Sequence, residues 1–254
     1  MITLSSDFGS PYPAAMKGAI ASRCDARMVD VAHDFPRQDT RTAAFWLREV
    51  LPYFPPAVHL AVVDPGVGTD RAAIAVRAGD HALVGPDNGV LIPAARRLAD
   101  RDTDVEAFEI ETDDPASATF HGRDVFAPAA AEIHAIGVDG MNDLSTLAPA
   151  ADYADLAFPR PDIDPDGASG EVLVVDDFGN AITNVPGEVL EGRPDGTVAV
   201  DGEPVPVEST YAAVPVGERL VTVGSHGNVE LAVNQERGED AFGIATGDSV
   251  RLDW

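Results

Sequence analysis

The stretch Val62-Val63-Asp64-Pro65-Gly66-Val67-Gly68-Thr69-Asp70-Arg71 decides how the first half of the chain folds. It continues an apolar run at 58–61, which predicts a buried strand. Pro65 ends this strand because proline cannot donate to a sheet ladder, and two glycines then allow a tight loop. Asp64 and Arg71 therefore stand at the two ends of one loop, where ligands bind in open α/β sheets. The alternative interpretation is a turn closed by a surface ion pair.

Strands and helices alternate on both sides of this loop. The apolar patterns predict strands at 2–5, 27–31, 72–76, 81–84 and 105–110, and helices at 14–22, 39–53, 91–98 and 127–136. Such alternation predicts a parallel or mixed sheet with helices on both faces. Four polar residues follow strand ends and should meet at one edge of this sheet: Asp7, Asp64, Asp87 and His121.

The pattern changes in the second half of the chain. Residues 149–170 are rich in proline and aspartate, which is typical of a linker. Short strands with frequent turns follow, and they predict a small β-barrel or sandwich. We therefore expect an α/β domain over residues 1–155, a linker over 156–169 and a smaller all-β domain over 170–254.

Composition limits the class of protein. The 254 residues include 43 acidic and 17 basic ones, a formal net charge of -26, and Lys17 is the single lysine. Nucleic-acid binding is disfavoured, because phosphate contacts need clustered basic residues. Self-repulsion on this scale is best tolerated in high salt, so we expect a salt-adapted, halophile-like cytoplasmic protein. The single cysteine excludes an internal disulfide, and neither a signal peptide nor a membrane span is expected.

His121 is the best catalytic candidate among six histidines, because it precedes a glycine and opens a helix. His33 is expected to border the site, whereas His59 and His81 lie within strands and are interpreted as structural. No HxxxH, HxH or CxxC spacing occurs, and Arg71 would repel a cation, so we predict no metal site. A G-x-S-x-G elbow, a P-loop and a complete GxGxxG motif are also absent.

Six short motifs occur in an order that resembles one known family. They are Ser6-Asp7-Phe8-Gly9, Met16-Lys17-Gly18, Val63-Asp64-Pro65-Gly66-Val67-Gly68, Gly85-Pro86-Asp87-Asn88-Gly89, Phe120-His121-Gly122-Arg123-Asp124-Val125-Phe126-Ala127-Pro128 and Asp177-Phe178-Gly179-Asn180. The ordered set is similar to the S-adenosyl-L-methionine (SAM) hydroxide adenosyltransferases, also called SAM hydrolases. These are related to the SAM-dependent fluorinase and chlorinase. The resemblance covers nearly the whole chain.

The resemblance implies a reaction and its catalytic residues. SAM and water would give adenosine and L-methionine by attack of water at the ribose C5′. The family's Asp-Arg-His set falls on Asp64, Arg71 and His121. Water is a poor nucleophile and needs a proton acceptor or a site that stabilises hydroxide. The sequence leaves open which of the three residues holds the proton at each step.

The resemblance also implies contacts to the substrate from both domains. Asp7 corresponds to the ligand of the ribose hydroxyls, and Asp176 to that of the methionine ammonium, although the neighbouring Asp177 leaves that choice open. Phe178 and Asn180 correspond to the adenine contacts. Ser225 corresponds to a serine that binds the methionine carboxylate. The next residue, His226, replaces an arginine of the halogenating relatives, and its role stays open.

The family is trimeric, with sites between the N-domain of one subunit and the C-domain of the next, so a homotrimer is expected. SAM is then the substrate and no cofactor is required. The sequence leaves two rival functions to weigh. Halogenating relatives carry an aromatic residue in place of Asp64 and lack the Arg-His partners, and the fluorinase has a longer segment where this chain has 15 residues between Arg71 and Asp87. A SAM or adenosine sensor without turnover is the other alternative.

Overall fold

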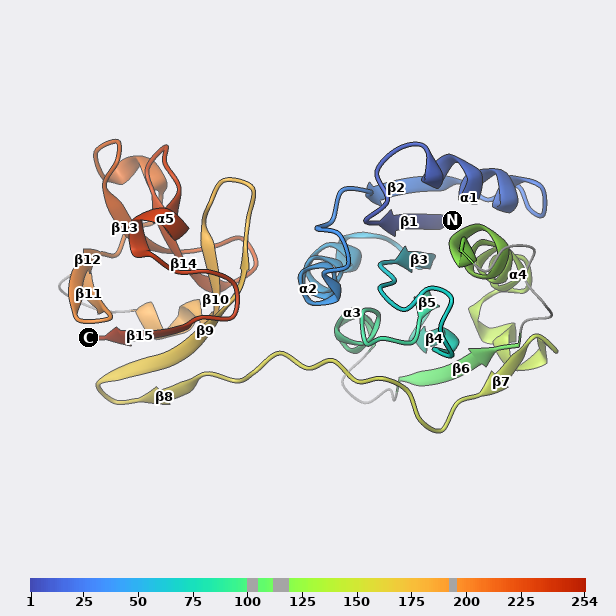
Figure 1. Cartoon of the computed structure of the whole chain (residues 1–254). Helices are drawn as coiled ribbons and strands as arrows, with labels where there is room; N and C mark the ends of the chain where they lie inside the picture. The colour runs from blue at the N-terminus through green and yellow to red at the C-terminus, as the bar shows by residue number, and fades with distance from the viewer. Residues whose placement is uncertain (100–104, 112–118, 192–195) are drawn as a thin grey trace. The chain divides into compact units, whose positions relative to one another are not determined.

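A computed structural model of the protein describes residues 1–99, 105–111, 119–191 and 196–254. The chain forms two compact units, Met1–Ala157 and Phe158–Trp254, here called unit 1 and unit 2 (Figure 1). Unit 1 contains a mixed sheet with helices, and unit 2 is built around antiparallel strands. The predicted fold class is therefore confirmed. No helix among the described residues has the length and apolar character to cross a membrane.

The sheet of unit 1 has seven strands in the order β2-β1-β3-β5-β4-β6-β7. Neighbours among the first four strands pair in parallel, and the remaining pairs are antiparallel. The carboxyl ends of β1, β3 and β5 therefore lie side by side at one edge, as the sequence predicts. The strands are β1 (Ile2–Ser6), β2 (Met28–Ala32), β3 (Val58–Val62), β4 (Ala73–Ala78), β5 (His81–Pro86), β6 (Glu106–Ile110) and β7 (Leu147–Pro149).

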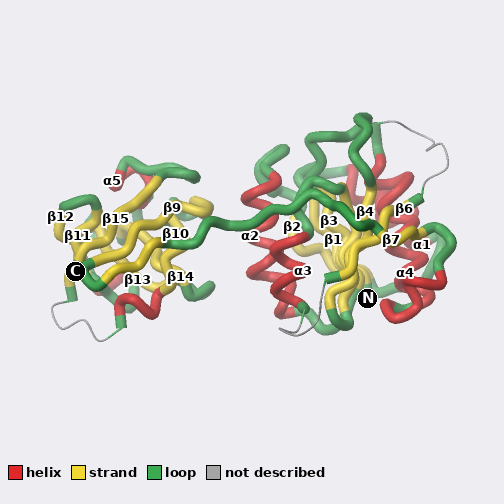
Figure 2. Tube along the Cα trace, turned by 90° about the horizontal axis from the view of Figure 1, so that it is seen from below, coloured by secondary structure: helices red, strands yellow, loops and turns green. Residues whose placement is uncertain are grey.

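Four helices cover the two faces of this sheet. Helices α1 (Tyr12–Ala21) and α4 (Ala127–Ile136) pack together on one face, and α2 (Thr40–Val50) and α3 (Ile92–Leu98) on the other (Figures 1 and 2). Met16 of α1 and Phe126 before α4 are fully buried against β1 and β3. Burying large apolar side chains such as these contributes about 1.5–3 kcal/mol each.

Helix boundaries follow local chemistry. Asp39 caps α2, because its Oδ1 accepts a hydrogen bond of 2.9 Å from the backbone N–H of Thr42. The helix predicted to run to residue 53 ends at Val50, and a 3₁₀ turn, η1 (Leu51–Tyr53), follows because Pro52 cannot supply a helical N–H. A second 3₁₀ segment, η3 (Val138–Asp143), follows α4.

Unit 2 is a nearly closed barrel. Its strands run in the order β12-β11-β15-β9-β10-β14-β13, and β8 pairs with β9. The two ends of this path meet where the backbone N–H of Glu208 donates to the carbonyl of Val221 at 2.9 Å. The elements are β8 (Asp162–Asp164), β9 (Gly167–Val175), β10 (Ala181–Pro186), η4 (Gly187–Leu190), β11 (Thr197–Val200), β12 (Glu203–Pro206), η5 (Tyr211–Ala213), β13 (Arg219–Val223), β14 (Asn228–Val233), α5 (Gly238–Phe242) and β15 (Ser249–Asp253).

The expected linker at 156–169 needs a correction. Residues Asp162–Asp164 form β8, and β9 already begins at Gly167. A hydrophobic pattern could not predict this short strand, because all three of its residues are exposed. It is held by antiparallel pairing with β9 and by an ion pair of 2.9 Å between Asp164 and Arg251.

Candidate active site

The loop after β3 folds back on itself and joins its two charged ends. Thr69 Oγ1 donates to the carbonyl of Gly66 at 2.7 Å, which tightens the turn. Arg71 then reaches Asp64 with two donors: its Nε lies 2.9 Å from Oδ1, and its Nη2 binds Oδ2. The side chains of Asp64 and Arg71 are 4% and 11% exposed. This is a buried, bidentate pair, so the alternative of a surface ion pair is wrong.

His121 joins the pair from a distant part of the chain. Arg71 Nη2 lies 3.1 Å from His121 Nδ1. A guanidinium can only donate, so Nδ1 accepts and the proton of the neutral ring sits on Nε2. His121 stands at the start of a π-helical turn, η2 (Gly122–Phe126), a geometry often found at functional sites. Gly122 leaves room there for the buried Met16 side chain, because a Cβ would come within 2.8 Å of Met16 Sδ and force it to move.

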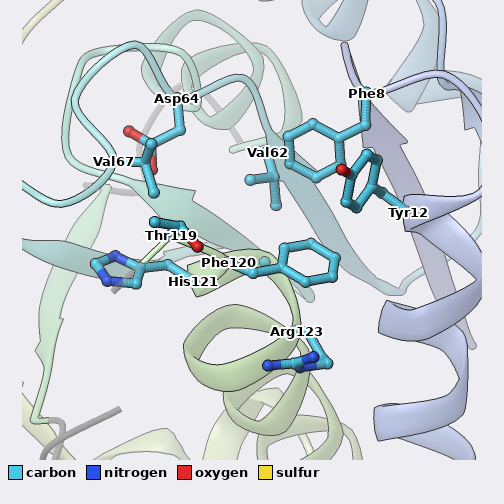
Figure 3. A pocket seen from close by; sticks show the side chains of 10 residues that line it. Phe8, Tyr12, Val62, Asp64, Val67, Thr119, Phe120, His121 and Arg123 are labelled. Carbon is cyan, nitrogen blue, oxygen red and sulfur yellow. The ribbon is translucent and has the colours of Figure 1, made fainter. Parts of the chain in front are cut away.

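Asp64 and His121 open onto a cavity of about 450 Å³. Figure 3 shows these two side chains at one end of it and the rings of Phe8, Tyr12 and Phe120 at the other. The cavity therefore has a polar end and an aromatic end. The residues that line it are Phe8, Tyr12, Val62, Asp64, Val67, Thr119, Phe120, His121, Gly122 and Arg123.

Two more strand-end aspartates have different surroundings. Asp7 precedes Phe8 of the cavity wall, and its Oδ2 accepts a hydrogen bond of 2.7 Å from the backbone N–H of Gln38. Asp87 Oδ1 accepts one of 2.7 Å from the backbone N–H of Ala154. Asp87 thus fixes the segment that leaves unit 1, a structural role for a residue that the sequence groups with the site.

A hydrogen-bonded network holds the segment between β1 and α1. His33 Nδ1 contacts Ser6 Oγ at 2.8 Å, and its backbone carbonyl accepts from the N–H of Gly9 at 2.8 Å. His33 Nε2 lies 3.0 Å from Asp30, which also binds Lys17 at 2.6 Å. Burial opposes ionisation of Asp30, but the hydrogen bonds of Lys17 and His33 lower its pKa overall. His33 therefore borders the site through the backbone that carries Asp7 and Phe8.

The other two strand histidines lie in the body of the sheet. His59 Nδ1 contacts Thr3 Oγ1 at 2.8 Å, and its Nε2 contacts His81 Nδ1 at 2.9 Å. Burial, together with the nearby charge of His81, lowers the pKa of His59 to about 3. Both histidine rings take part in side-chain hydrogen bonds that link neighbouring strands. This agrees with their interpretation as structural residues.

The predicted adenine and ammonium ligands share one turn of unit 2. Asp176 Oδ1 accepts from the backbone N–H groups of Phe178 and Asn180 at 3.0 and 2.9 Å, and its Oδ2 accepts from Asn180 Nδ2 at 3.0 Å. The Phe178 ring is 80% exposed, whereas Asn180 is buried. Asp177, the other candidate partner of the ammonium, is exposed.

The loop after β13 carries Ser225, which is exposed. Next to it in the same loop is His226, whose buried side chain meets the buried carboxylate of Glu230. Glu230 accepts a hydrogen bond of 2.7 Å from the hydroxyl of Tyr211 and faces His226 Nε2 at 3.3 Å. Burial and the neighbouring Glu230 raise the pKa of Tyr211. His226 Nδ1 accepts from the backbone N–H of Asn228 at 3.2 Å, so this histidine shapes the loop that presents Ser225.

Within the described parts of the chain, no group of three or more His, Cys, Asp and Glu side chains is arranged to hold a metal ion. Both units match models of known protein domains. The model of the SAM hydroxide adenosyltransferase N-terminal domain matches residues 2–141, and that of the C-terminal domain matches residues 170–251.

The chain belongs to the SAM hydroxide adenosyltransferase family. It is 42% identical over 258 residues to the (R)-S-adenosyl-L-methionine hydrolase of Salinispora tropica, with 99% of this chain and 97% of that protein covered. The protein of that name from Thermus thermophilus is 43% identical, with 97% of both chains covered.

Solved structures give the same relationship. An uncharacterized conserved protein from Thermotoga maritima superposes with a TM-score of 0.86 at 32% identity and covers 100% of both chains. A conserved hypothetical protein from Thermus thermophilus gives a TM-score of 0.77 at 40% identity, with 99% of this chain and 98% of that chain covered. The fold of this SAM hydroxide adenosyltransferase family member is therefore shared over its whole length.

The structure adds residues to the cavity that the sequence did not single out. Phe8, Phe120 and Arg123 occur within the motifs but carry no predicted role, and Tyr12 lies outside the motifs. Their signal was position: Phe8 follows Asp7, and Phe120 precedes His121. A rule that examines the neighbours of each predicted site residue, catalytic or substrate-binding, would have found these two of the four.

Proposed function

We propose that the protein hydrolyses SAM to adenosine and L-methionine. Water forms a bond from its oxygen to C5′ of the ribose, and the bond from C5′ to sulfur breaks. The sulfur keeps the electron pair and becomes the neutral thioether of methionine, and the water gives up one proton. The contact set of Asp64, Arg71 and His121 on one cavity is the observation that carries this proposal.

Each of the three residues has a role in this reaction. The Nε2–H of neutral His121 donates to the water oxygen, and a carboxylate oxygen of Asp64 accepts a proton from the water. Arg71 holds both partners and stabilises the hydroxide-like charge that develops. Hydroxide meeting a sulfonium cancels charge, so the apolar walls formed by Val62 and Val67 favour the reaction.

Unit 2 and Asp7 supply the binding of the substrate in this proposal. Asp7 takes the ribose hydroxyls, Phe178 and Asn180 the adenine, and Ser225 the methionine carboxylate. Asp176 takes the ammonium, with Asp177 as the other candidate. The high exposure of Phe178 supports this role, because an exposed ring has a face on which adenine can stack.

We also propose a homotrimer in which a neighbouring subunit supplies the unit 2 contacts. Co-refolding of Asp64→Asn with Asn180→Ala should then restore part of the activity. Co-assembled protein without activity above either variant would contradict this arrangement. The acidic surface supports a salt-adapted, cytoplasmic setting, and melting temperature should rise with KCl towards molar concentrations.

The substrate epimer can be specified further. The relatives carry (R)-S-adenosyl-L-methionine in their names, and we propose that this chain also consumes the (R) sulfonium epimer. Incubation with a mixture of both epimers, followed by chiral chromatography, should show loss of the (R) form first. Equal loss of both would remove this part of the proposal.

Chromatography of SAM incubated with the protein separates the proposed activity from its rivals. Adenosine and methionine indicate hydrolysis, intact SAM that stays bound indicates a sensor, and a 5′-halogenated nucleoside formed with added halide indicates a halogenase. In ¹⁸O water, one label should enter the adenosine 5′-hydroxyl and none the methionine. EDTA should leave the rate unchanged, since neither a metal nor a cofactor is proposed.

A further inference from the structure

Three aromatic rings form one wall of the cavity. Phe8 lies in the loop after β1, Tyr12 begins α1, and Phe120 precedes His121. Their ring centroids lie 6.2 Å apart for Phe8–Tyr12, 6.0 Å for Phe8–Phe120 and 5.4 Å for Tyr12–Phe120, all edge-to-face. The rings pack against one another, so they form a continuous aromatic wall and leave no cage between them (Figure 3). This set is here called the aromatic wall.

Two ionic side chains among the described lining residues, those of Asp64 and Arg123, are each paired with an oppositely charged residue behind the cavity wall. Asp64 supplies the carboxylate among the described residues that line the cavity, and Arg71 binds both oxygens of that carboxylate. Arg123 binds Asp124 with two donors at 2.6 and 2.7 Å. Among the described lining residues, the carboxylate that a cation would meet is therefore already neutralised by a guanidinium. The aromatic wall is then the part of the cavity best able to attract a cation.

Arg123 shows that a cation already uses part of this wall. Its Cζ lies 5.2 Å from the centroid of the Phe120 ring. In Figure 3 the guanidinium lies on the far side of Phe120 from Phe8 and Tyr12. The rings of Phe8 and Tyr12 are thus the part of the wall that a second cation would approach.

We infer that the aromatic wall binds the sulfonium group of the substrate, with the S-methyl group and adjacent carbons against the rings of Phe8 and Tyr12. This inference rests on the proposed function. Carbons bonded to a sulfonium carry positive charge and are attracted to aromatic faces, as quaternary ammonium groups are. Attack by water discharges the sulfur, so the attraction is lost when the thioether forms, which favours release of methionine.

An aromatic wall suits this chemistry better than a free carboxylate would. A carboxylate beside the sulfonium would hold the charged ground state strongly, whereas the transition state has lost part of that charge. It would also place a second nucleophile near C5′. Ring faces attract the cation more weakly and cannot attack carbon.

The test compares a cationic ligand with a neutral one. In one activity assay, KM is measured for SAM and an inhibition constant for S-adenosyl-L-homocysteine, the thioether that lacks the S-methyl group. Tyr12→Leu and Phe8→Leu should raise KM for SAM by about 3- to 30-fold, the range between exposed and desolvated cation–π contacts, since Tyr12 is 55% exposed without ligand. The inhibition constant of the thioether should change less than about 2-fold by the same reasoning.

Two control variants separate aromatic character from general packing. Tyr12→Phe keeps the ring and should behave as the wild type towards both ligands. Tyr53→Leu removes an aromatic side chain that is 83% exposed in η1, outside the cavity lining, and should also change neither constant. Circular dichroism melting identifies a variant that has lost its fold, and the remaining Leu variant then carries the test.

An equal rise in KM for SAM and in the inhibition constant of the thioether would overturn the inference. It would mean that the aromatic wall contributes only packing and does not recognise the positive charge. If the wild type does not turn SAM over, the proposed function fails, and both dissociation constants are measured directly by calorimetry. Selective loss of SAM binding in the Leu variants then still supports the aromatic wall as a sulfonium site. Absence of any binding by the wild type overturns both.

Discussion

The catalytic residues of unit 1 differ from two of the predicted substrate contacts of unit 2, Phe178 and Ser225, in how far each side chain is bonded within the protein and shielded from solvent. In unit 1, Asp64, Arg71 and His121 contact one another and are largely withdrawn from solvent. In unit 2, Phe178 and Ser225 are exposed. The reactive groups are therefore held in place before substrate arrives, whereas these binding groups face outward.

This difference corresponds to two kinds of free energy. A preorganised set of charges needs little rearrangement during reaction, so changes there should appear in kcat. Exposed groups gain contacts only when the ligand binds, so changes there should appear in KM. Two predictions test that division, and a third concerns the interior that supports the preorganised set; they run from the largest expected effect to the smallest.

The largest effect is expected at the preorganised pair. Asp64→Asn and His121→Asn should each lower kcat by about 10²- to 10⁴-fold, the range of lost acid–base assistance, with little change in SAM affinity. Asn is preferred to Ala at position 64, because its amide oxygen can still accept a hydrogen bond from Arg71, whereas Ala would leave the buried guanidinium without an acceptor there at a cost of about 1–3 kcal/mol. Single-turnover kinetics and calorimetry measure the two quantities.

A matched control for this prediction is Glu106→Gln, which removes the partner of Arg77 on the sheet of unit 1. Glu106 is 52% exposed and lies outside the cavity lining, so kcat should not change. A wild-type kcat in both Asp64→Asn and His121→Asn would falsify the catalytic assignment.

An intermediate effect is expected in unit 2. Phe178→Ala should raise KM for SAM by about 5- to 100-fold, because stacking of a base on an aromatic ring contributes about 1–3 kcal/mol. The free energy of unfolding should change by less than about 0.5 kcal/mol, as for other surface substitutions. Val216→Ala, at another exposed apolar residue of unit 2, is the control. A fall in kcat at constant KM would instead place Phe178 with the reactive groups.

The smallest effect concerns pH and the interior of unit 1. Folding holds the pKa of His59 at about 3, against its ordinary value of 6.5, so unfolding takes up a proton below about pH 6.5. The wild type should therefore lose about 1 kcal/mol of stability per pH unit between roughly pH 6.5 and 4 through this group. His59→Gln should lack that contribution.

The two tryptophans allow this measurement unit by unit, since Trp46 lies in α2 and Trp254 in unit 2. In a Trp254→Phe background, fluorescence of Trp46 reports unfolding of unit 1. Parallel pH profiles for the His59→Gln and reference proteins would contradict the role given to His59.

The sequence predicted features that depend on local pattern. Alternating apolar runs were sufficient for the parallel strands, and parallel strands bring their ends together, which placed Asp64 near Asp7. Asp87 was less predictable, because the group that it binds, the N–H of Ala154, lies 67 residues further along the chain. Strand β8, inside the expected linker, was missed because all three of its residues are exposed, so apolar periodicity carries no signal there.

The aromatic wall shows another limit of sequence reasoning. Phe8, Tyr12 and Phe120 come from three different elements, and only the packing of α1 beside the η2 turn brings them together. A single sequence contains the residues but not that juxtaposition. The family's motifs supplied the catalytic set, and the structure supplied its surroundings.

Lys17 has a consequence for chemical labelling. It is the single lysine of the chain, and its side chain is 34% exposed. Mild acylation by an amine-reactive reagent can therefore modify one side-chain amine, in addition to the α-amino group of Met1. Acylation removes the charge that pairs with Asp30, and Asp30 in turn supports His33 and the segment that carries Phe8. A probe placed on Lys17 would thus report from the outer end of the network that holds one edge of the cavity.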